Sequence, residues 1–245
     1  MLYHPQDAED ATQEILIKVL TRLSSFEGRS SFRTWLYRIV VNHVLNTKRG
    51  RVEVRQASID FASYGAALDD RPDLELADPK GTSAETDLLV TEAMISCTSG
   101  MLLCLDREQR LTFILGAIFE VSDTLAAEVL EITPDNFRQR LARARRDLRS
   151  FMNDKCGLVN QANPCRCAKK TRGFIQAGYV DPENLLFVRE RIREVREVAP
   201  KVYETINTLD GKCADTFRRH PFYQAPDIGQ MLRRLVESPD LRLKS

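Results

Sequence analysis

The stretch TPDNFRQRLARARRDL, residues 133–148, decides the architecture of the second half of this 245-residue chain. Thr133 suits the N-cap of a helix, and Pro134 is favoured at the first helical position because it has no backbone N–H to leave unpaired. Apolar side chains then recur at spacings of four, three and four residues, which place them on one helical face: Phe137, Leu141, Ala144 and Leu148. The stretch therefore predicts a helix with one buried face and one polar, cationic face.

A shorter helix is predicted just upstream of this one. Ser122 can cap a helix from Asp123 to Leu130, and Glu131 and Ile132 then form a tight turn. Two helices joined by such a turn, the second basic and opened by short polar residues, are typical of a helix-turn-helix unit. The second helix of such a unit enters the major groove of DNA.

A second cationic segment lies near the start of the chain. The helix predicted from Asp7 to Leu23 has apolar residues on one side, and its other side carries Asp10, Gln13 and Glu14. After a break, Ser30 or Ser31 can cap a further helix that runs to about Lys48.

One face of that further helix combines a cation with amides, which can bond phosphates and base edges: Arg38, Asn42 and Asn46. Aromatic side chains, on which unpaired bases can stack, lie beside this face: Phe26, Phe32, Trp35 and Tyr37. The alternative is that the rings belong to the core and that the arginines form a solvated face.

Charge is distributed unevenly, although Lys plus Arg (36) nearly balances Asp plus Glu (35). Residues 28–56 hold seven basic side chains and one acidic, residues 57–100 two basic and nine acidic, and residues 134–155 seven basic and three acidic. Glycine, proline and weak apolar periodicity predict a linker over residues 57–82. We therefore expect an all-α protein of two small helical domains (1–56 and 83–154), an acidic linker between them and a helical extension (155–245).

The amino-acid composition also limits the kind of protein this can be. A hydrophobic fraction of 43% and a charged fraction of 29% are typical of a folded protein. No apolar run approaches the roughly 18 residues of a membrane span, the first residues lack the order of a signal peptide, and six cysteines are too few for a disulfide-rich scaffold. We expect a cytoplasmic protein with reduced thiols and no membrane partner. No nucleophile–base pair, phosphate-binding loop or nucleotide fingerprint points to an enzyme.

The extension carries four of the six cysteines. Cys156, Cys165 and Cys167 lie in a loop rich in Asn, Pro and Gly, where three thiolates could converge; a closed zinc site needs a fourth ligand, which Cys213 or His220 could supply. The same soft ligands suit monovalent copper or an oxidant-sensitive thiol pair, and free thiols with no cofactor remain the alternative.

The other two cysteines, Cys97 and Cys104, lie in apolar sequence and are predicted to be core residues. Beyond the cysteine loop, apolar spacing predicts one long helix over residues 185–209 and a last helix over residues 227–237.

Three motifs in this order carry a resemblance to a known family: DAEDATQE at residues 7–14, SFRTWLYRI at 31–39 with Asn42, and FRQRLARAR at 137–145. Over roughly residues 5–154 the chain is similar to extracytoplasmic-function sigma factors, the compact subgroup of the bacterial sigma-70 class. The resemblance implies that the two helical units are regions two and four, which recruit RNA polymerase core to promoter DNA.

The resemblance also implies roles for individual residues. Docking on the clamp of the large polymerase subunit would fall to Asp10, Gln13 and Glu14. Opening of the minus-ten element and capture of a flipped base would fall to Phe26, Phe32, Trp35, Tyr37, Arg38, Asn42 and Asn46. The minus-thirty-five element would be read by Asp135, Asn136, Arg138, Gln139 and Arg143, with phosphate contacts from Arg145, Arg146 and Arg149.

The chain departs from the family in three places. Members of the family have some tens of residues ahead of the Asp10 helix, so we expect either a start further upstream or an incomplete region two. Thr12 stands where the family has an aliphatic residue. The extension is additional, and we expect it to control activity in place of a separate anti-sigma factor, although such a partner remains open.

Two other functions fit parts of the sequence. A helix-turn-helix regulator acting without core polymerase would explain the second unit but not the Asp10 helix or the Trp35 segment. A thiol or metal enzyme built on the extension would explain only the cysteines.

Overall fold

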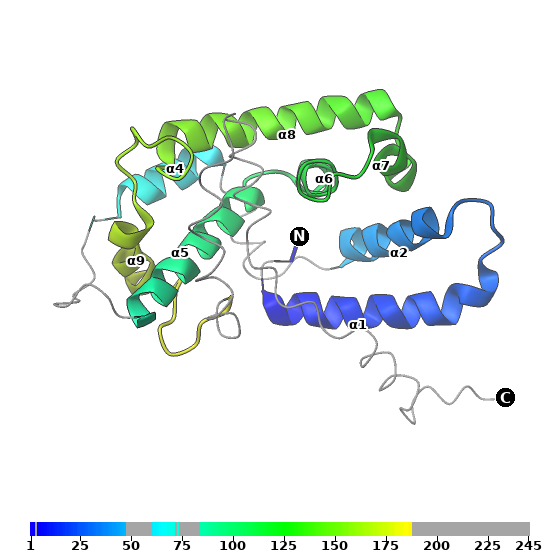
Figure 1. The fold of residues 1–245 in the computed structure, drawn as a ribbon, viewed down its shortest axis with the longest axis horizontal. Coiled ribbons are helices and arrows are strands. Elements are labelled where there is room, and N and C mark those ends of the chain that lie inside the picture. Colours follow the sequence, from blue (N-terminus) through cyan, green and yellow to red (C-terminus); the bar gives the residue numbers. More distant parts are fainter. Residues whose placement is uncertain (3, 48–59, 72, 74–83, 188–245) are drawn as a thin grey trace.

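The computed structural model describes residues 1–2, 4–47, 60–71, 73 and 84–187 (Figure 1). Every regular element in these residues is helical, which confirms the predicted all-α class. In chain order the elements are α1 (Pro5–Arg22), a 3-10 turn (Leu23–Ser25), α2 (Phe32–Asn46), α4 (Phe61–Asp69), α5 (Ala84–Leu103), α6 (Arg107–Phe113), a π turn (Ile114–Ile118), α7 (Asp123–Leu130), α8 (Pro134–Lys155) and α9 (Cys167–Gln176).

Helices α1 and α2 form an antiparallel pair (Figure 1). Ser31 is the N-cap of α2, and its hydroxyl accepts a hydrogen bond from the backbone N–H of Thr34, as the sequence predicts. Across the pair, the Nζ of Lys18 lies 2.6 Å from the Nδ1 of the buried His43. The pair buries few large side chains, so it depends on the rest of the molecule for part of its packing.

Helices α7 and α8 form the predicted helix-turn-helix. Ser122 caps α7, and Glu131 adopts a left-handed conformation (φ 55°) that turns the chain. Thr133 then caps α8 by accepting a hydrogen bond from the backbone N–H of Asn136 (3.2 Å), and Pro134 is the first helical residue. The buried face of α8 contains all the predicted apolar positions together with two later ones: Phe137, Leu141, Ala144, Leu148, Phe151 and Met152.

Helices α5 and α6 lie beneath α8 and share its core (Figure 1). The buried guanidinium of Arg110 on α6 bonds three backbone carbonyls where α5 ends: those of Leu102 (3.0 Å), Leu103 (3.5 Å) and Leu105 (3.0 Å). Helix C-termini leave carbonyls without partners inside the helix, so this arginine both satisfies them and fixes the corner between α5 and α6.

The predicted linker contains a helix, α4, that packs against the C-terminal half of α8. The rings of Phe61 and Tyr64 lie 5.3 and 5.9 Å from that of Phe151, measured between centroids. Asp60 caps α4, and Lys155 forms an ion pair with Asp69 at its other end. Apolar residues at helical spacing account for α4, and the acidic composition of the segment obscures them.

The described part of the extension packs on the second unit. Helix α9 lies along α5 (Figure 1), and Arg71 sits between the rings of Phe174 and Tyr179, with Cζ 4.4 and 4.6 Å from their centroids. The carboxylate of Glu92, which is 1% exposed, accepts hydrogen bonds from the backbone N–H groups of Leu186 (2.7 Å) and Phe187 (3.0 Å). The long helix predicted over residues 185–209 and the last helix at 227–237 lie outside the described residues, apart from residues 185–187.

Candidate DNA and polymerase interfaces

The polar face of α8 is fully presented to solvent. All eight residues predicted to contact the minus-thirty-five element are exposed: Asp135, Asn136, Arg138, Gln139, Arg143, Arg145, Arg146 and Arg149. Between them on the helix, Phe137 is only 1% exposed and packs into the core. The predicted division between a core face and a polar face therefore holds along the whole helix.

The arginines of α8 differ in the carboxylates with which they form ion pairs. Arg138, in the first turn of α8, pairs with Asp123 on α7 and with Asp135, and this pairing lowers the pKa of Asp123. Arg140, which was not among the predicted contacts, turns away and pairs with Glu108 on α6 (2.7 Å). Two carboxylates thus orient the guanidinium of Arg138 at the end of α8 where a recognition helix reads bases.

Three of the four predicted aromatic residues form one cluster at the end of the first unit. The ring centroids of Phe26, Phe32 and Trp35 lie 5.4 to 5.6 Å apart, and Phe32 is 47% exposed. Tyr37 does not join them, because it packs against the core and has Arg33 over its ring at 5.6 Å. A partly exposed aromatic cluster is an unusual surface for a soluble protein and suits stacking of unpaired bases.

The amide and cation face of α2 is split by a contact between the two units. Asn42 and Asn46 are exposed, whereas the guanidinium of Arg38 donates to the backbone carbonyl of Glu128 on α7 (3.3 Å) and lies 3.6 Å from its side-chain carboxylate. Sequence periodicity had no means of identifying Glu128, which is 90 residues away. In this arrangement Arg38 is committed to the protein rather than free for DNA.

The polar side of α1 forms a third exposed surface. Asp10, Gln13 and Glu14 are all exposed, with the partly exposed Ile17 one turn further on. Glu14 also approaches His43 (3.9 Å), whose pKa is lowered by burial and by the charge of Lys18, although Glu14 opposes this. The result is an acidic and amide surface that suits a basic partner.

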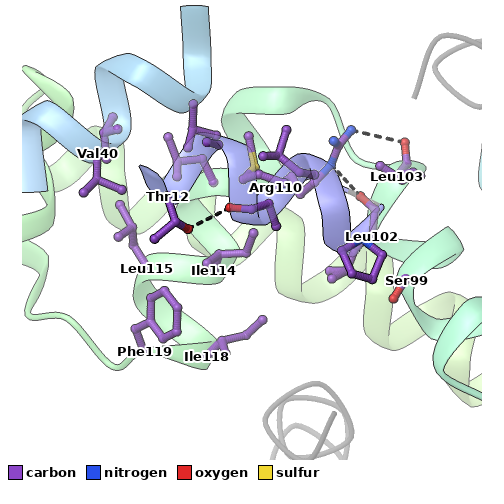
Figure 2. Close-up of a pocket in the computed structure, with 18 of the residues that line it drawn as sticks. Thr12, Val40, Ser99, Leu102, Leu103, Arg110, Ile114, Leu115, Ile118 and Phe119 are labelled. Atoms are coloured by element: carbon purple, nitrogen blue, oxygen red, sulfur yellow. Dashed lines mark hydrogen bonds between the residues drawn. The ribbon is translucent and has the colours of Figure 1, made fainter. Parts of the chain in front are cut away.

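An apolar cavity of about 410 Å³ lies where the first unit meets α5 and α6. Figure 2 labels residues of both units around it, among them Thr12 and Val40 of the first unit and Leu102, Ile114 and Leu115 of the second. Its lining is mostly apolar, so we assign it to packing between the units rather than to nucleic-acid recognition.

The cysteines of the extension lie where α8 ends and α9 begins. Cys156 is the C-cap of α8 and buried, Cys165 lies in the following loop, and Cys167 is the first residue of α9. Burial raises the pKa of Cys167 to about 12, with further contributions from Cys156 and Cys165. Within the described residues, no three His, Cys, Asp or Glu side chains stand in a ready-made metal cluster; Cys213 and His220 lie outside those residues.

None of the described helices is long and apolar enough to cross a membrane. A helix-turn-helix joined to a second helical unit, with exposed amides and cations on both, defines the class as a DNA-binding protein of transcription.

Comparisons with known proteins specify that class. The sigma-70 region 2 family model matches residues 1–53. The chain is 23% identical over 154 residues to a probable RNA polymerase sigma factor of Haemophilus influenzae, covering 60% of this chain and 78% of the relative. It is 26% identical over 164 residues to the ECF RNA polymerase sigma factor SigW of Bacillus subtilis, covering 63% of this chain and 80% of the relative. It is 29% identical over 147 residues to the ECF RNA polymerase sigma-E factor of Escherichia coli, covering 57% of this chain and 70% of the relative. Over about 150 residues the chain is thus similar to extracytoplasmic-function sigma factors of the sigma-70 class.

Proposed function

We propose that this sigma factor directs RNA polymerase core to promoters through three separate surfaces: α8 for the minus-thirty-five element, the end of the first unit for the minus-ten element, and α1 for core polymerase. The observation that carries the proposal is the complete exposure of the predicted reading face of α8 beside a fully buried apolar face. The domains follow as region two (1–56), linker (57–82), region four (83–154) and extension (155–245).

On α8, residues near the N-terminus read bases and later residues bind phosphates. Asn136 and Gln139 carry amides, which bond adenine edges, and Arg138 is oriented by its two carboxylates. Arg145, Arg146 and Arg149 lie further along the exposed face, where contact with the DNA backbone adds affinity but little sequence choice.

At the minus-ten element, the cluster of Phe26, Phe32 and Trp35 receives an extruded base. Stacking is worth about 1–3 kcal/mol per base, which is comparable with the few kcal/mol needed to unstack a nucleotide. Asn42 and Asn46 supply hydrogen bonds, and Arg38 joins them once it leaves Glu128. No catalytic group is needed for this step, and we propose no enzymatic activity and no required cofactor.

Core polymerase docks on the surface formed by Asp10, Gln13 and Glu14. This acidic surface and the aromatic cluster have no residue in common, so we propose that both are engaged together. We place the protein in the cytoplasm, where polymerase and promoters are. An anti-sigma factor is a further candidate partner, and a thiophilic metal is a candidate ligand of the extension.

Transcription from a promoter library tests this function. Bacterial core polymerase is incubated with the purified chain and DNA carrying randomised upstream sequence, and the 5′ ends of the transcripts are mapped. We expect a shared minus-ten and minus-thirty-five pattern that core polymerase alone does not give. A chain that retains DNA selectively without core, yet yields no specific transcript with it, is instead a helix-turn-helix regulator.

Three substitutions separate the surfaces. Asp10→Arg should reduce binding to core polymerase, Trp35→Ala should reduce open-complex formation, and Gln139→Ala should change the selected minus-thirty-five sequence. Arg172→Ala is the matched control, because it removes an exposed cation on α9, away from all three surfaces. Equal loss of every step in all variants would contradict the division of roles.

A further inference from the structure

The extension brings its cysteines to a fourth one that the sequence assigned to the core. Cys97 lies on α5, about sixty residues before the cysteine loop in the chain, and α9 packs along α5. Cys97 does contact the core, as predicted, but its thiol also lies close enough to interact electrostatically with those of Cys167, Cys156 and Cys165. Four thiols from three segments therefore share one neighbourhood.

The backbone around this neighbourhood is closely packed. A Cβ at Gly157 would lie 2.2 Å from the carbonyl oxygen of Cys165, so only glycine allows the loop to fold back on the end of α8. The side-chain amide of Asn163 donates to the carbonyls of Asn153 (2.7 Å) and Cys156 (3.4 Å). These contacts hold the two sides of the loop together and set Cys165 beside Cys156.

The helix that carries Cys97 is fixed at the same place. The hydroxyl of Tyr64 donates to the carbonyl oxygen of Cys97 (2.8 Å), and the hydroxyl of Ser96 donates to that of Tyr179 in the extension (3.4 Å). Both contacts join α5 to segments that are distant in sequence. The backbone around Cys97 is therefore fixed by contacts to α4 and to the segment that follows α9.

Thiolates are the soft donors that bind Zn²⁺ in structural sites. All four cysteines are free of disulfides and at least partly buried, so an ion held between them would be enclosed by protein. The sulfurs do not yet converge, but each cysteine can redirect its sulfur by rotation about a single Cα–Cβ bond.

We propose that Cys97, Cys156, Cys165 and Cys167 bind one Zn²⁺ ion as a structural four-thiolate site. Zinc in such sites is tetrahedral and fully enclosed by four protein ligands. The site joins α5, the C-terminal end of α8 and the N-terminal end of α9, so it fastens the extension to the helix-turn-helix unit. In this assignment Cys97 takes the place of the fourth ligand that the sequence analysis gave to Cys213 or His220. This inference does not depend on sigma activity.

Metal analysis of the purified full-length chain tests the proposal. The chain is prepared under reducing conditions with zinc present, and zinc is measured by mass spectrometry; we expect about one ion per chain. Replacement by Co²⁺ should give the intense visible absorption of a tetrahedral thiolate site. Cys97→Ser and Cys165→Ser should each bind zinc at least tenfold more weakly, whereas Cys213→Ser should bind as the natural chain does.

Cys104→Ser is the matched control. Cys104 lies just beyond α5, is also partly buried, and bonds the carbonyl oxygen of Gly100 instead of approaching the other thiols. It should leave the zinc content and the cobalt spectrum unchanged. A natural chain with far less than one zinc ion, or a Cys97→Ser chain with unchanged zinc affinity, overturns the proposal.

Alkylation of the natural chain tests the ligands without any substitution that could impair folding. N-ethylmaleimide is added to the zinc-loaded chain with and without a chelator, and each cysteine is followed by peptide mass spectrometry. We expect chelation to accelerate modification of all four proposed ligands and to leave the rate at Cys213 unchanged. Acceleration at Cys213 with none at Cys97 would mean that the fourth ligand comes from elsewhere.

Discussion

The buried carboxylate of Glu92 anchors the end of the described extension, and removing it should release that segment. Glu92→Leu replaces the carboxylate by an apolar side chain of similar size. The change removes both oxygen atoms that accept hydrogen bonds from the N–H groups of Leu186 and Phe187. Hydrogen bonds to a charged group contribute about 1.5–3 kcal/mol each, so two of them contribute at least about 3 kcal/mol to local stability. Because about 1.4 kcal/mol corresponds to a factor of ten, the two amides should exchange with solvent at least about a hundredfold faster.

Amide hydrogen exchange on the full chain measures this effect directly. The matched control is Glu183→Leu, the same change at an exposed position of the same segment, which should leave the exchange of both amides within a few-fold of the original. Protection that persists at Leu186 and Phe187 in the Glu92→Leu chain would refute the argument, since other contacts would then be sufficient to hold the extension on α5.

Three further results are expected. Leu148→Ala should lower the free energy of unfolding by about 2–5 kcal/mol, because Leu148 is 0% exposed; chemical denaturation measures this. The pKa of His43 is lowered in the folded chain, so the unfolded chain binds more protons and stability should fall as pH drops below 6.5. Thermal unfolding measures this: the fall between pH 6.5 and lower pH should be smaller in His43→Gln than in the original, whereas above pH 6.5 the two should differ by a constant amount. Arg149→Ala should weaken binding of the holoenzyme to all promoters alike and reduce the salt dependence of binding by about one counterion. Gln139→Ala should leave the salt dependence unchanged and alter the preferred sequence. The opposite pattern would mean that Gln139 contacts phosphate and Arg149 reads a base.

Among the described helices, local signals in the sequence were sufficient for α1, α2, α7 and α8, whereas α4, α5, α6 and α9 were not predicted individually. The cap and proline of α8, the Ser31 cap of α2 and the spacing of Phe137 to Leu148 are confirmed because each depends on residues within a few positions of one another. Helix α4 was missed because its apolar residues, such as Tyr64, stand in an acidic segment with glycine and proline.

Contacts between distant segments could not be predicted from periodicity. The pairing of Arg38 with Glu128 and the approach of Cys97 to the cysteine loop depend on which helix faces meet, and a single helix pattern does not specify its neighbour. The candidate site residues on α1 and α8 are exposed, as their predicted roles require, but the roles themselves remain predictions. Tyr37 illustrates the limit, because its ring lies with the core and not with the aromatic cluster.

Helix α8 runs without interruption from Pro134 to Lys155, with the turn that we propose to read DNA at one end and Cys156 at the other. At 1.5 Å per residue it is a rod of roughly 33 Å. If the cysteine end acted as a pivot, a tilt of about ten degrees would displace the reading end by roughly 6 Å, which exceeds the roughly 3.4 Å between successive base pairs. A small change of geometry at the thiols is thereby large enough, at the opposite tip, to move the side chains of Asn136 and Gln139 by more than one base-pair step, which would shift them from the bases that we propose they read.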